Sequence, residues 1–241
     1  GFVGGFGGLA AALVFEAMQA KVPSDRPVRS LSISFVGPLA VDVPVSFEAE
    51  VLREGKAVSQ VLGRAVQNGQ VVTLVQGSFG AARVSAVRVE AEPAPELPPV
   101  EACQELPYIS GATPEFTRHL VMRWGIGGLP FSGNTSREMG GWVRQRGEVD
   151  REPVTVSHLL ALVDAWPPAV LPHLNSFAPG SSLTWTIEFV QPLPIIDTHE
   201  WCRYRAVIEH AQDGYGHCAA ALWTGKGELI ALSRQTVTVF G

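Results

Sequence analysis

The stretch Phe35-Val36-Gly37-Pro38-Leu39 returns 154 residues later as Phe189-Val190-Gln191-Pro192-Leu193, with four of the five residues identical. Short matches arise by chance, so the flanking sequence must show whether the chain repeats itself. A shift of 158 residues lays Ala57 to Phe79 on Tyr215 to Val237 without a gap, and many apolar positions coincide. Identities are few, but the order of predicted elements is shared. The chain is therefore expected to contain two copies of one fold.

One helical segment precedes the proline motif in each copy. Leu9 to Gln19 and Ser157 to Trp166 are apolar around most of their circumference, and proline follows each of them. A helix without a polar face is typical of a buried position. Each half is therefore predicted to enclose one helix.

Strand-like runs follow each helix, and the turns between them are plausible hairpins. Asn68-Gly69 and Gly225-Lys226-Gly227 supply residues that tolerate positive φ. The second half has an extra segment before its helix, Phe116 to Trp124 and Gly141 to Gly147. We expect an α+β fold in which a long antiparallel sheet wraps round a central helix, twice, with the halves meeting sheet edge to sheet edge. The predicted strands are Ser30 to Val36, Val45 to Leu52, Ala57 to Gln67, Gln70 to Phe79, Ser182 to Val190, Trp201 to His210, Gly216 to Thr224 and Glu228 to Phe240.

An acidic, proline-rich stretch from Glu90 to Pro99 is typical of an extended linker. It divides the chain into an N-terminal domain over residues 1–89, a linker over 90–112 and a C-terminal domain over 113–241. The N-terminal domain has no counterpart of the first predicted strand of the C-terminal domain.

Composition excludes several classes of protein. With 46% apolar and 17% charged residues, the 241-residue chain is expected to be globular and soluble, and its net charge of -5 argues against a nucleic-acid partner. Glu16 and the glycines around Gly1 to Ala20 interrupt the most apolar stretch, so no membrane span is expected. The histidines show no metal-ligand spacing. Three cysteines without C-x-x-C spacing favour a reducing compartment, which predicts a cytoplasmic location.

In several stretches the sequence resembles the acyl-CoA thioesterase II family, whose members carry two tandem hotdog domains in one chain. The resemblance extends over nearly the whole sequence. It implies a double hotdog fold, hydrolysis of a fatty acyl-CoA or related thioester to free acid and CoA in fatty acid metabolism, no cofactor besides the CoA of the substrate, and a homodimer or higher homo-oligomer. The stretches are Val3-Gly4-Gly5, Arg53-Glu54-Gly55-Lys56, Ala65-Val66-Gln67-Asn68-Gly69, Gly77-Ser78-Phe79, Phe189-Val190-Gln191-Pro192 and Ser233-Arg234-Gln235.

The resemblance also implies a catalytic set made of a carboxylate on the second central helix, a hydroxyl on the following strand and a glutamine on the last strand. The carboxylate falls on Asp164 and the glutamine on Gln235. The hydroxyl falls on Ser182, with Thr184 as the alternative.

The residues themselves support two of these roles. Asp164 follows Leu160 by four residues, which places it on the buried stripe of its helix, where desolvation makes a carboxylate a better base. Gln235 alternates with Ala231 and Val237 on a largely apolar face, where a buried amide without partners costs about 1–3 kcal/mol. A purely structural role remains open for each residue. Asp164 would fix the end of its helix, and Gln235 would hydrogen-bond to a fixed neighbouring group.

The hydroxyl has less support from the pattern. Strict alternation places Ser182 and Thr184 on one face of the strand and Trp185 on the other. Both hydroxyls then point away from the apolar side, unless a bulge changes the alternation. Gly4, Gly5 and Phe6 at the start of the first helix are expected to bind substrate, because backbone N–H groups there can polarise a carbonyl.

Two other functions fit the same fold. A hotdog hydratase or dehydratase would need a histidine beside an acid, and His158 at the start of the second helix is the available one. A non-catalytic binder of acyl thioesters or lipids would keep the apolar slot and dispense with the polar set.

Overall fold

The computed structural model describes residues 7–108, 118–130, 132–147, 151–167, 169, 171–174 and 180–239. Two α-helices and eleven strands follow one another in the order expected from the sequence. The first half contains α1 (Gly7–Gln19), β1 (Val28–Phe35), β2 (Ser46–Glu54), β3 (Val58–Gln67) and β4 (Gln70–Gly80). The second contains β5 (Gln104–Glu105), β6 (Leu120–Ile126), β7 (Glu138–Gln145), α2 (Val156–Asp164), β8 (Gly180–Phe189), β9 (Cys202–Gln212), β10 (Tyr215–Thr224) and β11 (Leu229–Val239), with 3-10 turns at Val100–Ala102 and Leu171–His173.

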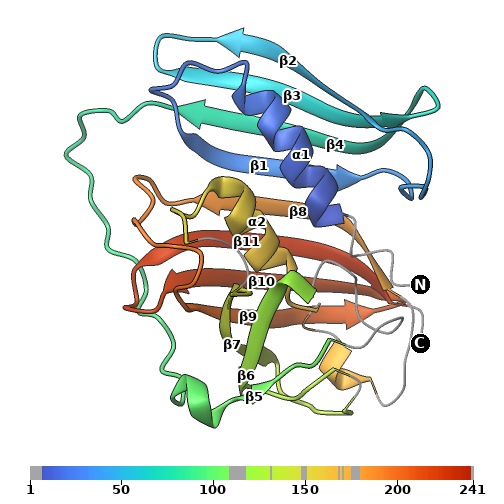
Figure 1. Ribbon diagram of the computed structural model, residues 1–241, viewed down its shortest axis with the longest axis vertical. Coiled ribbons are helices and arrows are strands. Elements are labelled where there is room, and N and C mark those ends of the chain that lie inside the picture. Colours follow the sequence, from blue (N-terminus) through green and yellow to red (C-terminus); the bar gives the residue numbers. More distant parts are fainter. Residues whose placement is uncertain are drawn as a thin grey trace.

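All the described strands belong to one antiparallel sheet, in the order β2-β3-β4-β1-β8-β11-β10-β9-β7-β6-β5. The first half supplies the first four strands and the second half supplies the rest (Figure 1). β1 and β8 join the halves, from Ser30 opposite Glu188 to Ser34 opposite Thr184. The expectation of two hotdog domains that meet edge to edge is confirmed, and the contact covers one otherwise exposed edge of each half.

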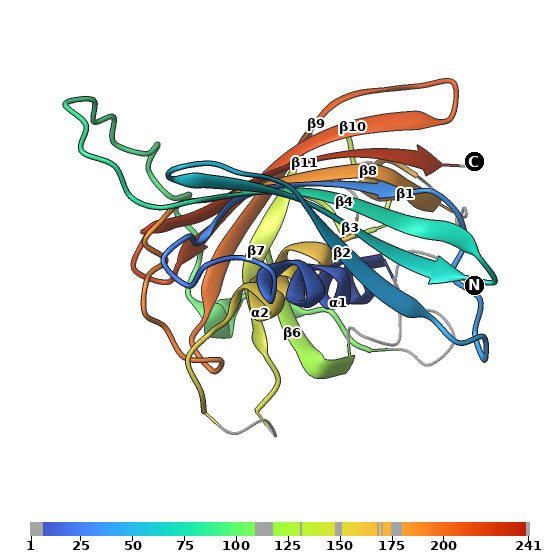
Figure 2. The same cartoon turned by 90° about the horizontal axis from the view of Figure 1, so that it is seen from above.

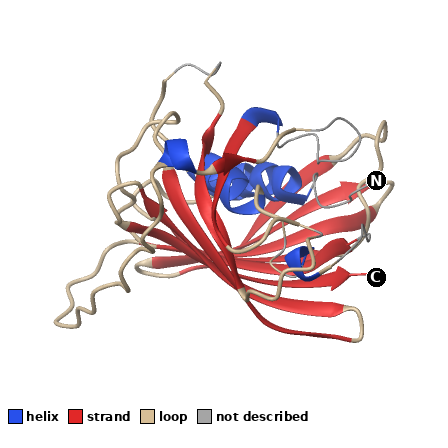
Figure 3. Ribbon diagram, turned by 90° about the horizontal axis from the view of Figure 1, so that it is seen from below, coloured by secondary structure: helices blue, strands red, loops and turns tan. Residues whose placement is uncertain are grey.

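The sheet is strongly curved, and both helices lie side by side in its hollow (Figures 2 and 3). α2 buries Leu159, Leu160, Leu162 and Val163, as its apolar sequence predicts. α1 buries Val14, Phe15 and Met18 but leaves Leu9 and Leu13 exposed, so it is not enclosed on every side. Neither helix has the length or the apolar character needed to cross a membrane, within the ranges that the structure describes.

Turn chemistry sets the register of the hairpins. Asn68 and Gly69 have φ values of 49° and 73° between β3 and β4, as a two-residue type I′ turn requires. Asp213 and Gly214, with φ values of 55° and 84°, make the corresponding turn between β9 and β10, which the sequence analysis did not single out.

The proline-rich segment after β4 is tied to the second half. The side chain of Trp142 donates to the Pro98 carbonyl at 3.0 Å, and Arg203 donates to the Pro95 carbonyl at 3.0 Å. β5 then pairs with β6 at the far edge of the sheet. The segment therefore runs along the second half and adds the last strand to its sheet.

A β-bulge in β8 changes the direction of its first side chains. Trp185 lies opposite Gln235 and Thr184 opposite Thr236, but Ser182 lies opposite Val237, which leaves Leu183 as the extra residue. Directly opposed residues share one face of a sheet, and a bulge reverses the alternation. Ser182 therefore faces the same side as Trp185 and Gln235, although strict alternation predicts the opposite.

Candidate active site

The N-terminal cap of α2 fixes the start of this short helix. The Thr155 side chain accepts from the His158 backbone N–H at 3.4 Å, and His158 Nδ1 accepts from the Thr155 backbone N–H at 3.0 Å. Reciprocal capping of this kind satisfies two backbone donors that the helix itself leaves free. The helix ends at Asp164, three residues before Pro167, so the carboxylate is held at a defined end.

α1 and α2 run antiparallel, and each contributes to the other's end. Gly8 near the start of α1 packs against Asp164, so closely that a Cβ at Gly8 would overlap the carboxylate. At the opposite end, Ser157 Oγ donates to Glu16 Oε1 at 3.1 Å. The first half of the chain therefore supplies backbone directly beside the acid of the second half.

Burial raises the pKa of the Asp164 carboxyl to about 7, and the hydrogen bond from the Gly8 backbone N–H lowers it by less. Asp164 keeps some exposure because it lines a cavity, but its Oδ2 atom is buried and has no hydrogen-bond partner among the described residues. A buried oxygen without a hydrogen-bond partner costs free energy. The packing of the surrounding fold must therefore offset this cost. Near neutral pH this carboxylate can accept a proton.

The structure brings Ser182 and Gln235 to Asp164. Gln235 Nε2 donates to Ser182 Oγ at 2.6 Å across β11 and β8. Ser182 and Asp164 line one cavity, and Gln235 and Asp164 line another. Of the three side chains expected at the site, Ser182 and Gln235 therefore lie beside the carboxylate of the third, Asp164.

Thr184 does not join this group. It lies opposite Thr236 on the other face of the sheet and is exposed, because the bulge turns only Ser182 inward. The alternative that Thr184 supplies the hydroxyl has no support in its position. Gly4, Gly5 and Phe6, expected to bind substrate, lie outside the described residues.

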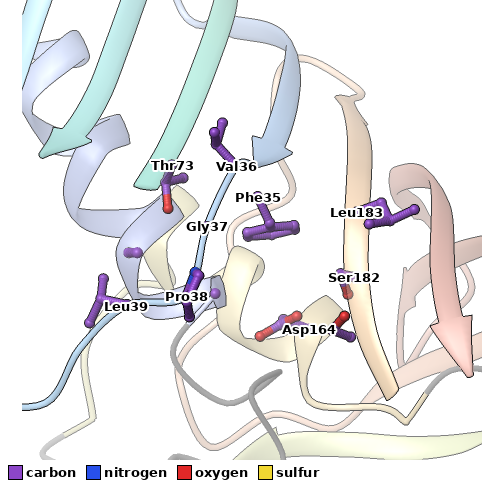
Figure 4. A pocket seen from close by; sticks show the side chains of 12 residues that line it. Phe35, Val36, Gly37, Pro38, Leu39, Thr73, Asp164, Ser182 and Leu183 are labelled. Carbon is purple, nitrogen blue, oxygen red and sulfur yellow. The ribbon is translucent and has the colours of Figure 1, made fainter. Parts of the chain in front are cut away.

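The larger cavity has a volume of about 340 Å³, which is within the range of about 300–1,000 Å³ typical of ligand pockets. It opens between the halves, beside the junction of β1 with β8 (Figure 4). Both halves line it, with Asp164 and Ser182 at one side and mostly apolar groups elsewhere. Its lining residues are Gly7, Ala10, Phe35, Val36, Gly37, Pro38, Leu39, Thr73, Asp164, Ser181, Ser182 and Leu183.

A smaller cavity, about 20 Å³, is also lined by Asp164. A polar space needs about 10–15 Å³ to hold one water molecule. Asp164 and Gln235 provide acceptor and amide atoms there, among aromatic walls from Trp166, Trp185 and Tyr204. Burial raises the pKa of the Tyr204 phenol, and Cys218 and Asp164 raise it further. The site therefore has room for one water molecule in contact with the carboxylate.

Sequence reasoning missed four residues that the structure places at the site, Gly7, Gly8, Phe35 and Tyr204. Gly7 and Gly8 belong to the glycine-rich start of the first helix, and Phe35 opens the repeated motif, so both signals were visible. Tyr204 gives no signal, because a tyrosine in a strand is ordinary.

An acid, a hydroxyl and an amide around a pocket between two tandem hotdog halves define a double hotdog thioesterase. The family model described as "Acyl-CoA thioesterase C-terminal domain" matches residues 100–239, and that of the "Acyl-CoA thioesterase N-terminal domain" matches residues 3–80. The chain belongs to the acyl-CoA thioesterase II family and is a thioester hydrolase. The hydratase and the non-catalytic binder are not favoured by these matches.

Individual relatives agree with this assignment. The chain is 25% identical over 252 aligned residues to acyl-CoA thioesterase 2 of Haemophilus influenzae, covering 98% of this chain and 87% of that protein. A hot dog protein of unknown function from Alicyclobacillus acidocaldarius has a TM-score of 0.80 at 24% identity, covering 98% and 87% of the two chains. An acyl-CoA thioesterase II from Mycobacterium marinum has a TM-score of 0.80 at 20% identity, covering 99% and 90%. These two structures show the shared fold.

Proposed function

We propose that the chain hydrolyses acyl-CoA with Asp164 as the general base. The observation that carries this proposal is the Asp164 carboxylate, whose Oδ2 atom is buried without a partner among the described residues. Asp164 lines both a large, mostly apolar pocket and a cavity of one-water size. A base is most effective when its pKa is near the working pH, and the pKa of about 7 for this carboxyl meets that condition.

In the first step, Asp164 removes a proton from the water as the water oxygen attacks the thioester carbonyl carbon. Negative charge develops on the carbonyl oxygen, and the backbone N–H of Gly7 receives it, since a helix leaves its first donors without partners within the helix and the Gly8 N–H already donates to Asp164. Gly7 is in the first turn of α1 and lines the pocket.

In the second step, the C–S bond breaks and the protonated Asp164 returns its proton to the departing sulfur. The acid and CoA leave, and the carboxylate is regenerated. Ser182 and Gln235 form a hydrogen-bonded pair beside Asp164 and hold the water between them and the carboxylate. The electrons balance without a metal or a redox cofactor.

Release of free thiol from acyl-CoA tests the role of Asp164. Asp164→Asn keeps the shape of the side chain but cannot accept the proton, so we expect kcat to fall about 10²–10⁴-fold. Glu16→Gln is the matched control, because Glu16 is an exposed acid on the other central helix. Undiminished release by Asp164→Asn would remove this residue from the mechanism, and no release by the wild type would favour a binding protein.

The setting of the reaction is also a proposal. We propose a cytoplasmic enzyme of fatty acid metabolism, supported by three buried cysteines without C-x-x-C spacing. We further propose a homodimer or larger assembly, for which light scattering should give at least twice the 25.8 kDa of one chain.

Activity that survives dialysis against a chelator would agree with a reaction that uses no metal.

A further inference from the structure

Phe35 is the last residue of β1, and it lies on the face of the strand that points toward the helices. Leu31 and Ile33, four and two residues earlier, share this face and are buried. Phe35 itself is only half-buried and lies opposite Thr73 of β4. Its ring comes from the first half of the chain, whereas Asp164, Ser182 and Gln235 come from the second.

The ring stands close to the reacting end of the pocket. A Cβ added to Gly7 would lie 2.9 Å from Phe35 Cε1 and 3.4 Å from Cδ1 and Cζ, so the ring rests on the first residue of α1. The next residue, Gly8, packs against Asp164. Figure 4 shows the ring between Asp164 and Ser182 on one side and Thr73 and Val36 on the other.

The rest of the pocket suits hydrocarbon better than a phosphate or a polar arm. Among the described residues that line it, Asp164 is the only ionisable one, and none is a lysine or an arginine. Val36, Gly37, Pro38 and Leu39 follow Phe35 along the chain and line the same cavity. A hydrocarbon chain bound there, with the thioester carbon beside Asp164, shares the cavity with the ring of Phe35.

We propose that the acyl chain of the substrate occupies this pocket and that Phe35 is the specificity-determining residue that limits its length. The inference rests on the proposed hydrolysis of acyl-CoA. The ring takes up part of the cavity that the hydrocarbon fills, so a longer chain must displace it. Overfilling a packed apolar site is unfavourable, whereas removing the ring enlarges the cavity.

The test compares kcat/KM for acetyl-, butanoyl-, octanoyl-, dodecanoyl- and hexadecanoyl-CoA in the wild type, Phe35→Ala and Tyr215→Ala. We expect the dodecanoyl-to-butanoyl ratio to rise about tenfold or more in Phe35→Ala, as is typical when a pocket wall is removed. Tyr215→Ala is the matched control, because Tyr215 is another aromatic strand residue, is 50% exposed and does not line the cavity. Its ratio should stay within about threefold of the wild type.

A Phe35→Ala ratio that stays within the range of Tyr215→Ala would overturn the inference. If Phe35→Ala does not fold, Phe35→Leu should move the ratio in the same direction by less, and an unchanged ratio there would also overturn it. Failure of the proposed function gives a different result, since the wild type would then release no thiol, or Asp164→Asn would remain active with the ratio still dependent on residue 35.

Discussion

Asp164 is costly to the folded chain, and this cost is what makes it useful as a base. Its carboxylate lies among Trp166, Trp185 and Tyr204, and the Gly8 backbone N–H is the main group that favours the charge. A residue selected for stability alone would be apolar here, or would have an ion-pair partner. Stability is commonly lost at sites that need such a residue. The carboxylate is therefore expected to lower the stability of the enzyme once it ionises.

Asp164→Asn should stabilise the protein, and more so at higher pH. The pKa of the folded carboxyl, about 7, is above that of the unfolded one, 3.8, so the folded state binds the extra proton between these values. Stability linked to this group is therefore present below pH 4 and is lost as the pH rises to about 7. The gain from Asp164→Asn should be small at about pH 4 and on the order of 2–4 kcal/mol at about pH 8.

Urea unfolding of the wild type and Asp164→Asn at both pH values measures this difference. Glu16→Gln serves as the reference, because it makes the matching change from an acid to its amide at an exposed position on the other central helix. An equal gain for Asp164→Asn at both pH values would mean that folding does not raise the pKa of this carboxyl, and would contradict the account.

At the scale of elements, the bulge in β8 determines which hydroxyl belongs to the site. Leu183 is the extra residue between Ser182 and Thr184. In a regular strand Ser182 and Thr184 would face the same side of the sheet, but here they face opposite sides. Ser182 then meets Gln235, and Thr184 is exposed. One extra residue in one strand therefore separates a site residue from a surface residue.

Ser182→Ala should lower kcat about tenfold or more, because it leaves the half-buried Gln235 amide without its acceptor. Thr184→Ala removes a hydroxyl from the same strand and should change kcat by less than about threefold. Steady-state thiol release measures both. The opposite order, with Thr184→Ala the more damaged variant, would place the hydroxyl role on the outer face.

The same bulge shows where sequence reasoning reaches its limit. Helices and strands could be predicted to within a few residues, because apolar periodicity and turns such as Asn68-Gly69 are local signals. Asp164 and Gln235 could be singled out because each is polar on an apolar face. The inward turn of Ser182 depends on the pairing of β8 with β11, which no local pattern in β8 reveals.

At the scale of the whole molecule, the site exists only because two halves share one sheet. The junction of β1 with β8 sets Leu31 opposite Ile187 and Ile33 opposite Trp185, and all four side chains are buried. The repeat in the sequence predicted that the halves meet at their edges. It could not tell that β1 and β8 form the junction, which places Phe35 of one half beside Asp164 of the other.

Because the core is continuous across this junction, Ile33→Ala should destabilise both halves together. We expect a loss of about 2–5 kcal/mol, as for other buried isoleucines, and one thermal transition that shifts as a whole in calorimetry. Two separate transitions, with only the first shifted, would show that the halves unfold independently.

The dependence of kcat/KM on pH tests most directly whether Asp164 is the base. With a medium-chain acyl-CoA such as octanoyl-CoA, kcat/KM should rise about tenfold per pH unit at low pH and level off above pH about 7, where the carboxylate is ionised. In Asp164→Asn the residual rate should lack this inflection. A wild-type profile that is flat through neutral pH, or an inflection that persists in Asp164→Asn, would contradict the assignment of the base.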